Sequence, residues 1–412
     1  MKPIHAWLLA SSISLSVFGD PSLVKLYEEL HANPELSYKE KDTASKLAQE
    51  LKASGFEVTV GVGGHGVVGV LKNGAGRTLM LRADMDALPV EELTGLKYAS
   101  KSKGVMHACG HDIHMANLVG VTRYLANHRE EWKGTLVAVF QPAEEKGAGA
   151  KAMMKDGLFK RFPKPDFAVA LHVSGEMATG TVGFHPGYAL AAADSIDISI
   201  RGKGGHGALP HKAIDPVYLA SAFVVDLQSL ISREKDPVES AVLTVGSFHC
   251  GTKHNIISDR CDLQLTLRTF SPKVRTRLIE GLERKAKAIA MGAGAPEPVI
   301  KVDEEPLAAL YNDLALGEKV VSILKKKVGE KNVIETPPVL AAEDFGRYAE
   351  GKLPIFLFWL GTIEPGRLKK QSESGKLPPL HSAQYYPDAE KALETGVPAM
   401  TAVAIGLLSS AP

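Results

Sequence analysis

Side chains that commonly bind divalent metals or carry protons cluster in three short segments of the sequence. Residues 107–114 read His-Ala-Cys-Gly-His-Asp-Ile-His and offer a thiol, imidazoles and a carboxylate. Glu144 and Glu145 are adjacent, and His172 stands at the end of an apolar run. Thiolate, imidazole and carboxylate groups are the usual ligands of zinc-like divalent metals. The residue types therefore indicate a metal centre.

The spacing of these residues matches no zinc finger. Structural zinc sites usually pair their ligands closely in sequence and fill all four positions with side chains. Here a single thiol is combined with carboxylates from distant segments, which is typical of a catalytic metal site with open positions. Taken singly, Glu144 and Glu145 could begin a solvated helix, and His172 could be a core histidine. Their joint placement after separate strands favours the metal centre.

Short apolar runs rich in β-branched residues alternate with helical segments in the first part of the chain. This order is typical of an α/β domain with a largely parallel sheet, with strands expected at residues 56–60, 66–71, 78–82, 135–140 and 167–171. Ligands of such sheets bind beyond the carboxyl ends of the strands. Asp84 and Asp86 follow the third run, and Glu144 with Glu145 follows the fourth. We therefore expect these groups on one rim.

Two helices are expected before the first strand. A helix should begin at Pro21, where leucines recur at helical spacing. Ser37 followed three residues later by Glu40 is a capping-box pattern, which predicts a second helix that ends at Gly55.

Residues 193–304 have a different pattern and are expected to form an inserted domain. Residues 195–201 alternate strictly between apolar and polar, as a half-solvated strand does. The elements expected after it are a helix from Asp215, strands at 241–248 and 262–269, a helix at 272–289 and a strand at 299–302. The order βαββαβ is that of a ferredoxin-like unit. It would divide the α/β domain into residues 20–192 and 305–412.

Composition excludes several classes of partner. Lysine plus arginine number 48 and aspartate plus glutamate 47, so no overall field draws the protein to nucleic acid or to an acidic membrane surface. The three cysteines, Cys109, Cys250 and Cys261, are too few for a disulfide framework. Cys250 and Cys261 are expected to be buried small apolar residues.

The start of the chain predicts export. Residues 1–19 combine a lysine with a short, serine-rich apolar stretch that is too short to span a bilayer. This pattern favours a secretory signal peptide and a periplasmic or secreted protein. The alternative is a cytoplasmic protein whose N-terminal segment packs on the body.

Several motifs together resemble a known enzyme family. Residues 81–89 (LRADMDALP), 106–114 (MHACGHDIH), 140–145 (FQPAEE) and 170–172 (ALH) resemble metal-dependent amidohydrolases. These include hippurate hydrolases, N-acyl-amino-acid hydrolases and auxin-conjugate hydrolases, a branch of the aminoacylase and glutamate-carboxypeptidase superfamily. The resemblance continues in order through residues 202–211, 251–259, 267–269, 342–345 and 380–381. It implies a di-metal peptidase domain with a ferredoxin-like lid that dimerises.

The resemblance also implies roles for individual residues. Two divalent ions, manganese, zinc, cobalt or nickel, would be held by Cys109, His111, Glu145, His172 and His381. Glu144 would be the general base, and Asp86 would orient a ligand. In the lid, His206 would meet the developing oxyanion, across a dimer in one arrangement, while Asn255 and Arg268 would hold a substrate carboxylate. Asp84 and His114 are further candidates for orienting ligands.

The reaction implied is the hydrolysis of N-acyl amino acids by a homodimer. A dipeptidase or metallocarboxypeptidase on the same scaffold is the alternative enzyme. A non-catalytic metal-binding or amino-acid-binding protein is a further alternative, against which the presence of Glu144 argues. The sequence departs from the family's usual residues at Ile113, Met115, Lys253, Ser258 and Leu265. These positions flank the implied site, so they bear on specificity more than on the reaction.

Overall fold

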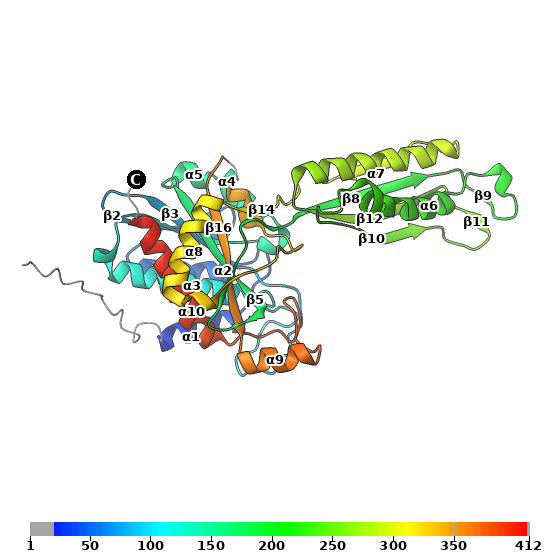
Figure 1. Ribbon diagram of the computed structural model, residues 1–412. Helices are drawn as coiled ribbons and strands as arrows, with labels where there is room; N and C mark the ends of the chain where they lie inside the picture. The colour runs from blue at the N-terminus through cyan, green and yellow to red at the C-terminus, as the bar shows by residue number, and fades with distance from the viewer. Residues whose placement is uncertain (1–19, 350, 410–412) are drawn as a thin grey trace, which may run out of the picture.

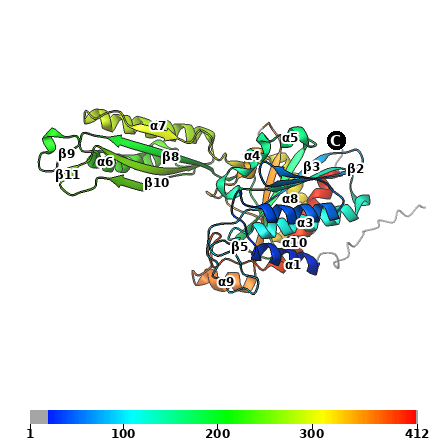
Figure 2. The same cartoon turned by 180° about the vertical axis from the view of Figure 1, so that it is seen from behind.

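The structure is a computed structural model that describes residues 20–349 and 351–409. A large α/β body carries an elongated lid that projects from it (Figures 1 and 2). The body is built around a sheet of eight strands: β1 (Glu57–Val62), β2 (Gly66–Asn73), β3 (Thr78–Asp84), β4 (Gly134–Gln141), β5 (Phe167–Ala178), β6 (Val182–Phe184), β15 (Val333–Glu335) and β16 (Ile355–Ile363). Their order across the sheet is β1-β2-β4-β3-β5-β16-β6-β15.

The centre of this sheet is parallel. Strands β4, β3, β5 and β16 pair in parallel, whereas β1 and β2 form an antiparallel edge. Side chains alternate between faces along a strand. Leu79 and Leu81 accordingly enter one hydrophobic core, and Met80 enters a second core on the opposite face. Burial on both faces explains the continuous apolar runs. The mixed α/β fold with a mostly parallel sheet, expected from the sequence, is confirmed.

Helices cover both faces of the sheet. One face carries α1 (Pro21–Ala32), α2 (Lys41–Ala53), α3 (His111–Asn127), α8 (Leu314–Val328) and α10 (Ala389–Leu408). The other carries α4 (Gly149–Lys155), α5 (Leu158–Arg161) and the 3-10 helix Asp344–Ala349. Helix α9 (Pro365–Glu373) follows β16. Helix α10 is long and apolar enough to cross a membrane, but most of it is buried against α3 and α8, so it is a core helix of the body.

The lid is a separate four-stranded antiparallel sheet with two helices. Its elements are β8 (Ala192–Arg201), α6 (Pro216–Ser229), β10 (Ala241–Cys250), β12 (Arg260–Thr269), α7 (Pro272–Gly292) and β13 (Val299–Val302). The strand order is β10-β12-β8-β13, that of a ferredoxin-like unit. Ile196, Ile198 and Ile200 are buried in the lid core with residues of α6 and α7, while Ser195 and Asp197, which alternate with them, are exposed.

Two short strand pairs lie at the two ends of the lid. Strands β7 (Gly187–Leu190) and β14 (Leu310–Asn312) pair where the chain leaves and re-enters the body. Strands β9 (Gly205–His206) and β11 (Ile256–Ile257) pair at the end of the lid that lies farthest from the body, here called the lid tip, residues 202–213 and 251–259 (Figure 1).

The capping-box prediction is wrong. Helix α2 begins at Lys41, and neither Ser37 nor Glu40 caps it through its side chain. The Ser37 hydroxyl instead donates to Asp86 Oδ2 at 2.6 Å. Glu40 Oε1 accepts the backbone N–H of Ala143 at 2.7 Å. Both side chains therefore serve the turn beside the candidate site, because tertiary partners compete with the local cap.

The expectation for two of the cysteines is also wrong. Cys250 and Cys261 form a disulfide between β10 and β12. The two residues face each other directly in the strand register, with their Cα atoms 4.5 Å apart. This separation is within the usual range for a disulfide. Neither residue is the free small apolar side chain that the composition suggested.

Candidate metal centre

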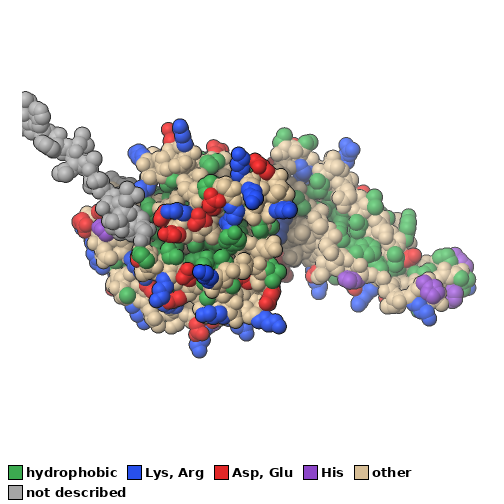
Figure 3. Space-filling model, turned by 90° about the horizontal axis from the view of Figure 1, so that it is seen from below, with side chains coloured by type: hydrophobic (Ala, Val, Ile, Leu, Met, Phe, Trp, Pro, Cys, Tyr) green, Lys and Arg blue, Asp and Glu red, His purple; other side chains and the backbone are tan. Residues whose placement is uncertain are grey.

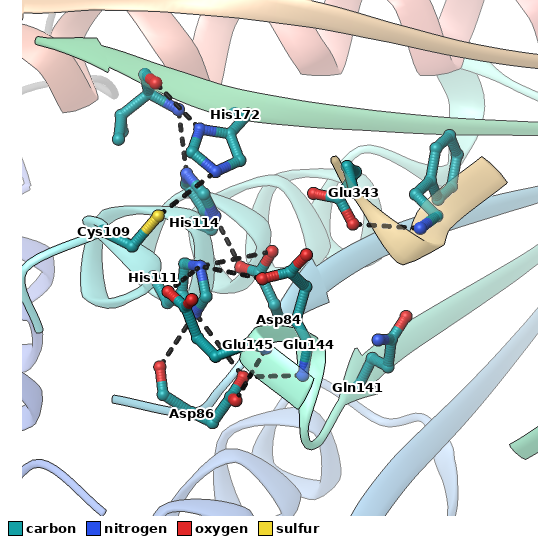
Figure 4. Close-up of polar contacts among 12 residues, drawn as sticks. Asp84, Asp86, Cys109, His111, His114, Gln141, Glu144, Glu145, His172 and Glu343 are labelled. Carbon is teal, nitrogen blue, oxygen red and sulfur yellow. Dashed lines mark hydrogen bonds and ion pairs between the residues drawn. The ribbon is translucent and has the colours of Figure 1, made fainter. Parts of the chain in front are cut away.

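The five predicted ligands come together at the carboxyl edge of the central strands. Cys109 lies in the loop before α3, and His111 is the first residue of α3. Glu145 lies in the 3-10 helix Glu144–Lys146 after β4, and His172 lies in β5. His381 lies between α9 and α10. Figure 4 shows four of these side chains pointing toward one another.

A glycine allows Cys109 and His111 to converge. Gly110 between them has φ +78°, a left-handed conformation that favours glycine. A Cβ atom at this position would lie 2.5 Å from Cγ2 of Val173, the residue that follows His172 in β5. The loop therefore approaches β5 so closely that only glycine fits, and this brings the cysteine and both histidines together.

The donor atoms form two overlapping groups that share the cysteine sulfur. Cys109, His111 and His172 form one group, and Cys109, Glu145 and His381 form the other, with the donor atoms in each within 4.8 Å of one another. Cys109 Sγ lies 3.6 Å from His172 Nε2 and 3.3 Å from His381 Nε2. His381 Nε2 lies 3.6 Å from Glu145 Oε1. Sulfur, nitrogen and oxygen donors in this mixture suit zinc-like divalent metals.

The histidines are oriented with one ring nitrogen free. His111 donates from Nδ1 to the backbone oxygen of Asp86 at 2.8 Å, and His172 donates from Nδ1 to the backbone oxygen of Val173 at 2.8 Å. Each ring therefore directs Nε2 toward the other donor atoms, as metal-binding histidines do. His111 Nε2 and Glu145 Oε1 are buried and have no hydrogen-bond partner among the described residues. Since buried polar atoms are normally satisfied, these two atoms fit metal ligands.

Burial opposes charge at this centre in the bare protein. It raises the pKa of the Cys109 thiol well above its usual range and lowers the pKa of His172. A divalent cation reverses the first effect, because a coordinating thiol is deprotonated. The lowered pKa of His172 keeps its ring neutral, which is the form that binds a metal.

Asp86 anchors the turn that carries the two glutamates. Its Oδ1 accepts the backbone N–H of Glu144 at 3.0 Å, and its Oδ2 accepts that of Glu145 at 3.1 Å and the Ser37 hydroxyl at 2.6 Å. Its backbone oxygen also holds His111. Asp86 thus orients two predicted ligands, His111 and Glu145, together with the adjacent Glu144 (Figure 4).

Glu144 and Glu145 have different surroundings. Both face His111 in one donor group, but Glu145 also groups with Cys109 and His381, whereas Glu144 also groups with Glu343 and Asp344. Burial raises the pKa of Glu144 well above its usual range, and the carboxylates of Glu343 and Asp344 raise it further. This arrangement agrees with a division in which Glu145 binds metal and Glu144 moves protons, although both roles stay predictions.

The structure adds a buried ionic cluster that the sequence reasoning missed. Arg82 donates to Asp84 Oδ2 at 2.6 Å, to Glu343 Oε1 at 2.9 Å and to Asp344 Oδ1 at 3.1 Å. Its Nε donates to Gln141 Oε1 at 3.0 Å. Arg82 therefore ties the two sequence halves of the body together beside Glu144. A charged residue inside an apolar strand was the available signal, because such a residue needs buried partners.

Asp84 and His114 bind each other and other protein groups beside the centre. The backbone N–H of Val173 donates to His114 Nε2 at 2.9 Å, so His114 carries its proton on Nδ1. It donates this proton to Asp84 Oδ1 at 2.5 Å. Both ring nitrogens are thus occupied, and Asp84 is held between His114 and Arg82.

A second buried charge cluster lies behind helix α3. His31, in the last turn of α1, contacts Asp112 Oδ2 through Nδ1 at 2.6 Å and Glu92 Oε1 through Nε2 at 3.2 Å. Burial lowers the pKa of His31, but the two carboxylates outweigh it and raise the pKa to about 9. His31 is therefore charged at neutral pH and holds the start of α3, next to His111.

The lid residues lie apart from this centre within the chain. His206 lies in β9 and the exposed Asn255 next to β11, both at the lid tip, where Figure 3 shows histidines gathered. Arg268 is partly exposed at the body end of β12, paired in register with Ala193. The single chain does not bring His206 or Asn255 to the metal ligands, so their roles stay predictions.

Comparison with known proteins agrees with this geometry. The chain is 37% identical over 387 residues to thermostable carboxypeptidase 2 of Saccharolobus solfataricus, covering 93% of this chain and 94% of the relative. It is 40% identical over 338 residues to hippurate hydrolase of Campylobacter jejuni, covering 81% and 86%. The solved structure of the Bacillus subtilis YXEP protein, a dinuclear metal-binding peptidase, superposes with a TM-score of 0.79 at 30% identity, covering 95% and 99%.

The family resemblance noted from the motifs is confirmed by these relatives. Together with the two donor groups, the dinuclear relative supports two metal ions at this centre. The model of peptidase family M20/M25/M40 matches residues 80–386, which include all five predicted ligands. The chain therefore belongs to peptidase family M20/M25/M40, a family of metal-dependent hydrolases of amide bonds.

Proposed function

We propose that this protein hydrolyses the amide bond of N-acyl amino acids, releasing a carboxylate and a free amino acid. The observation that carries the proposal is a pair of buried donor atoms next to the carboxylate of Glu144, His111 Nε2 and Glu145 Oε1, which have no hydrogen-bond partner among the described residues. The relatives support the substrate class, since they include a hippurate hydrolase and an N-acetyl-L-cysteine deacetylase from Bacillus subtilis.

The residues divide the work of the reaction. Two divalent ions held by Cys109, His111, Glu145, His172 and His381 would polarise the scissile carbonyl and acidify a water molecule. Glu144 takes a proton from that water as its oxygen bonds to the acyl carbon. Glu144 then passes the proton to the leaving nitrogen as the C–N bond breaks.

The native metal is proposed to be zinc, manganese, cobalt or nickel. A thiolate with imidazoles favours zinc, cobalt and nickel over magnesium or calcium. Glu145 and the open positions also accommodate manganese, which prefers oxygen ligands.

The lid is proposed to complete the site in a homodimer. The backbone N–H of Ala208 donates to His206 Nδ1 at 3.0 Å, so the neutral ring carries its proton on Nε2, free to donate to an oxyanion. His206 lies on the exposed lid tip, away from its own metal ligands, and we propose that it serves the site of a second copy. Asn255 and Arg268 would hold the substrate carboxylate.

We further propose that the protein is exported to the periplasm or secreted. The predicted signal peptide lies outside the described residues. The Cys250–Cys261 disulfide supports the proposal, because disulfides persist mainly in oxidising compartments. Mass measurement of the mature protein from fractionated cells tests it, and an intact N-terminus in a cytoplasmic fraction would contradict it.

A metal and substrate panel tests the proposed reaction. The chain, stripped of metal and reloaded with one of the four metals at a time, is assayed on N-acetyl, N-benzoyl and free dipeptide substrates. We expect chelation to abolish hydrolysis, one or more metals to restore it, and N-acyl amino acids to be preferred. Full activity in excess chelator, with no metal found by elemental analysis, would refute the metal assignment.

The second candidate is a carboxypeptidase or dipeptidase on the same scaffold, which the thermostable carboxypeptidase relative favours. Preference for free dipeptides in the panel would support it.

The carboxylate role of Arg268 is tested separately by a double cycle of Arg268→Ala against an amidated substrate. A hydrogen bond to a charged group contributes about 1.5 to 3 kcal/mol, or roughly ten- to more than a hundredfold in catalytic efficiency. Fully additive losses would show that Arg268 does not bind the carboxylate.

A further inference from the structure

The Cys250–Cys261 disulfide closes the base of the loop that forms half of the lid tip. Cys250 is the last residue of β10, and Cys261 is the second residue of β12. The bond spans a sequence separation of 11 residues. The loop between them carries Asn255 and strand β11, so the cross-link lies directly below the groups proposed to meet substrate.

The loop is joined to the strand that carries His206 by backbone contacts. Ile256 pairs with His206 in the β9–β11 ladder, and the N–H of Gly207 donates to the backbone oxygen of Asn255 at 2.9 Å. A Cβ atom on Gly207 would lie 3.1 Å from the backbone of Asn255, so the two segments are in close contact. The position of His206 is therefore coupled to the position of the loop.

The lid core does not reach this end of the lid. Of the described residues, none in 202–213 or 251–259 belongs to the lid's hydrophobic core, whose members toward the tip include Cys261, with Cys250 partly buried against it. Residues 251–256 and His206 are exposed. A two-stranded pair without a core is only marginally stable in water. A covalent cross-link at the base removes part of the loop's conformational freedom.

We propose that Cys250 and Cys261 are positioning residues, whose disulfide holds the lid tip in the conformation that binds substrate. This inference rests on the proposed function of Asn255 and His206. The bond forms when two thiols transfer two electrons and two protons to a disulfide-bearing oxidant, such as a thiol–disulfide oxidoreductase, which is reduced to a dithiol. The substrate-binding conformation of the lid tip would then depend on oxidation of Cys250 and Cys261, which takes place in an oxidising compartment.

Two double variants of the metal-loaded full chain test the proposal. Cys250→Ser with Cys261→Ser removes the bond and the packing, and Cys250→Val with Cys261→Val removes the bond but keeps an apolar pair. Alkylation after unfolding without reductant should modify only Cys109 in the wild-type chain. Leu278→Ala is the matched control, because it opens the lid core in α7 and leaves the tip and its disulfide intact.

Both double variants, the serine pair and the valine pair, should lose hydrogen-exchange protection at the amides of Gly207 and Ile256. Their catalytic efficiency on N-acyl amino acids should fall roughly ten- to a hundredfold, since a misplacement of about 1 Å can cost a hundredfold. Metal content should not change. Leu278→Ala should lower the stability of the lid but keep the tip amides protected and the catalytic efficiency near that of the wild type.

Two results would overturn the proposal. One is unchanged protection at the tip amides in the serine pair, and the other is wild-type catalytic efficiency in either pair. Recovery by the valine pair alone would show that packing, and not the covalent bond, positions the tip. If the wild-type chain hydrolyses no N-acyl amino acid, the proposed function fails instead, and this outcome is separate from the exchange results.

Discussion

Replacing Asp86 by asparagine should disturb the proposed general base and a metal ligand together. Asp86 is 1% exposed, and its two carboxylate oxygens accept the backbone N–H groups of Glu144 and Glu145 and the Ser37 hydroxyl. Burial by itself would raise the pKa of Asp86, but the neighbouring His111 ring and the hydrogen bonds from the Ser37 hydroxyl and the Glu145 N–H outweigh it and lower the pKa. The side chain is therefore an ionised acceptor at neutral pH.

The magnitude follows from the donors that asparagine cannot satisfy. Its single oxygen can keep one of the two backbone N–H groups, but its amide nitrogen would then face the other, a donor against a donor. The Ser37 hydroxyl can rotate to accept from the amide. One charge-assisted bond is thus lost, which costs about 1.5 to 3 kcal/mol. If the lost bond displaces Glu144 and Glu145 and the transition state loses this amount of stabilisation, catalytic efficiency drops by roughly ten- to more than a hundredfold.

Two quantities are measured. Catalytic efficiency is determined at a saturating metal concentration, and metal affinity is determined by competition with a chromophoric chelator. Ser37→Ala is the matched control, because it removes a bond to the same carboxylate but leaves both backbone N–H groups bound. Its loss should be smaller than that of Asp86→Asn, since the Ser37 hydroxyl holds neither Glu144 nor Glu145 directly. Wild-type efficiency and metal affinity in Asp86→Asn would refute the argument that Asp86 positions the two glutamates.

Three further predictions concern the base, the pH dependence of stability and the buried arginine. Glu144→Gln should keep its metal while turnover falls about a hundred- to ten-thousandfold, and Glu145→Gln should weaken metal binding. Elemental analysis and steady-state kinetics distinguish the two variants. If the two phenotypes were exchanged, the roles of Glu144 and Glu145 would be reversed. The pKa of His31 is raised from 6.5 to about 9 in the folded protein, so its stabilisation is fully present below pH 6.5 and is lost as the pH rises through 9. Urea unfolding across this range should show a decline on the order of 3 kcal/mol that His31→Gln removes, and a parallel pH profile in the variant would contradict the pairing. Arg82→Met leaves buried carboxylates without their cation and should lower the free energy of unfolding by about 3 to 5 kcal/mol, whereas a change below 1 kcal/mol would show that the cluster is not held by this charge.

The local pattern of the sequence determined the elements and their class. Runs buried on both faces must be apolar throughout, so the central strands were recognisable, and the alternation in residues 195–201 identified the half-solvated β8. Strand ends also indicated that Glu144 and His172 would lie on one rim of the sheet, because parallel strands end at one edge. These features depend on periodicity along the chain, which the sequence displays directly.

Predictions from the local sequence pattern were wrong where a side chain could bind more than one partner. Ser37 and Glu40 fit a capping box, yet both bind groups beside the candidate site because Asp86 and Ala143 are brought to them by the fold. Cys250 and Cys261 became a disulfide because the β10–β12 register places them opposite each other. A bond between strands depends on register, which spacing in the sequence does not determine.

The longest-range contacts were decided only by the tertiary structure. Cys109 meets His381 across a separation of 272 residues, and Arg82 meets Glu343 across 261. The motifs named the first pair only through resemblance, and nothing in the sequence paired the second. The ring nitrogen that His111 and His172 each direct at the centre was equally hidden, since it depends on which backbone group binds the other nitrogen. Partners of this kind are selected by the packing of distant segments, and a one-dimensional pattern carries periodicity and burial but not that packing.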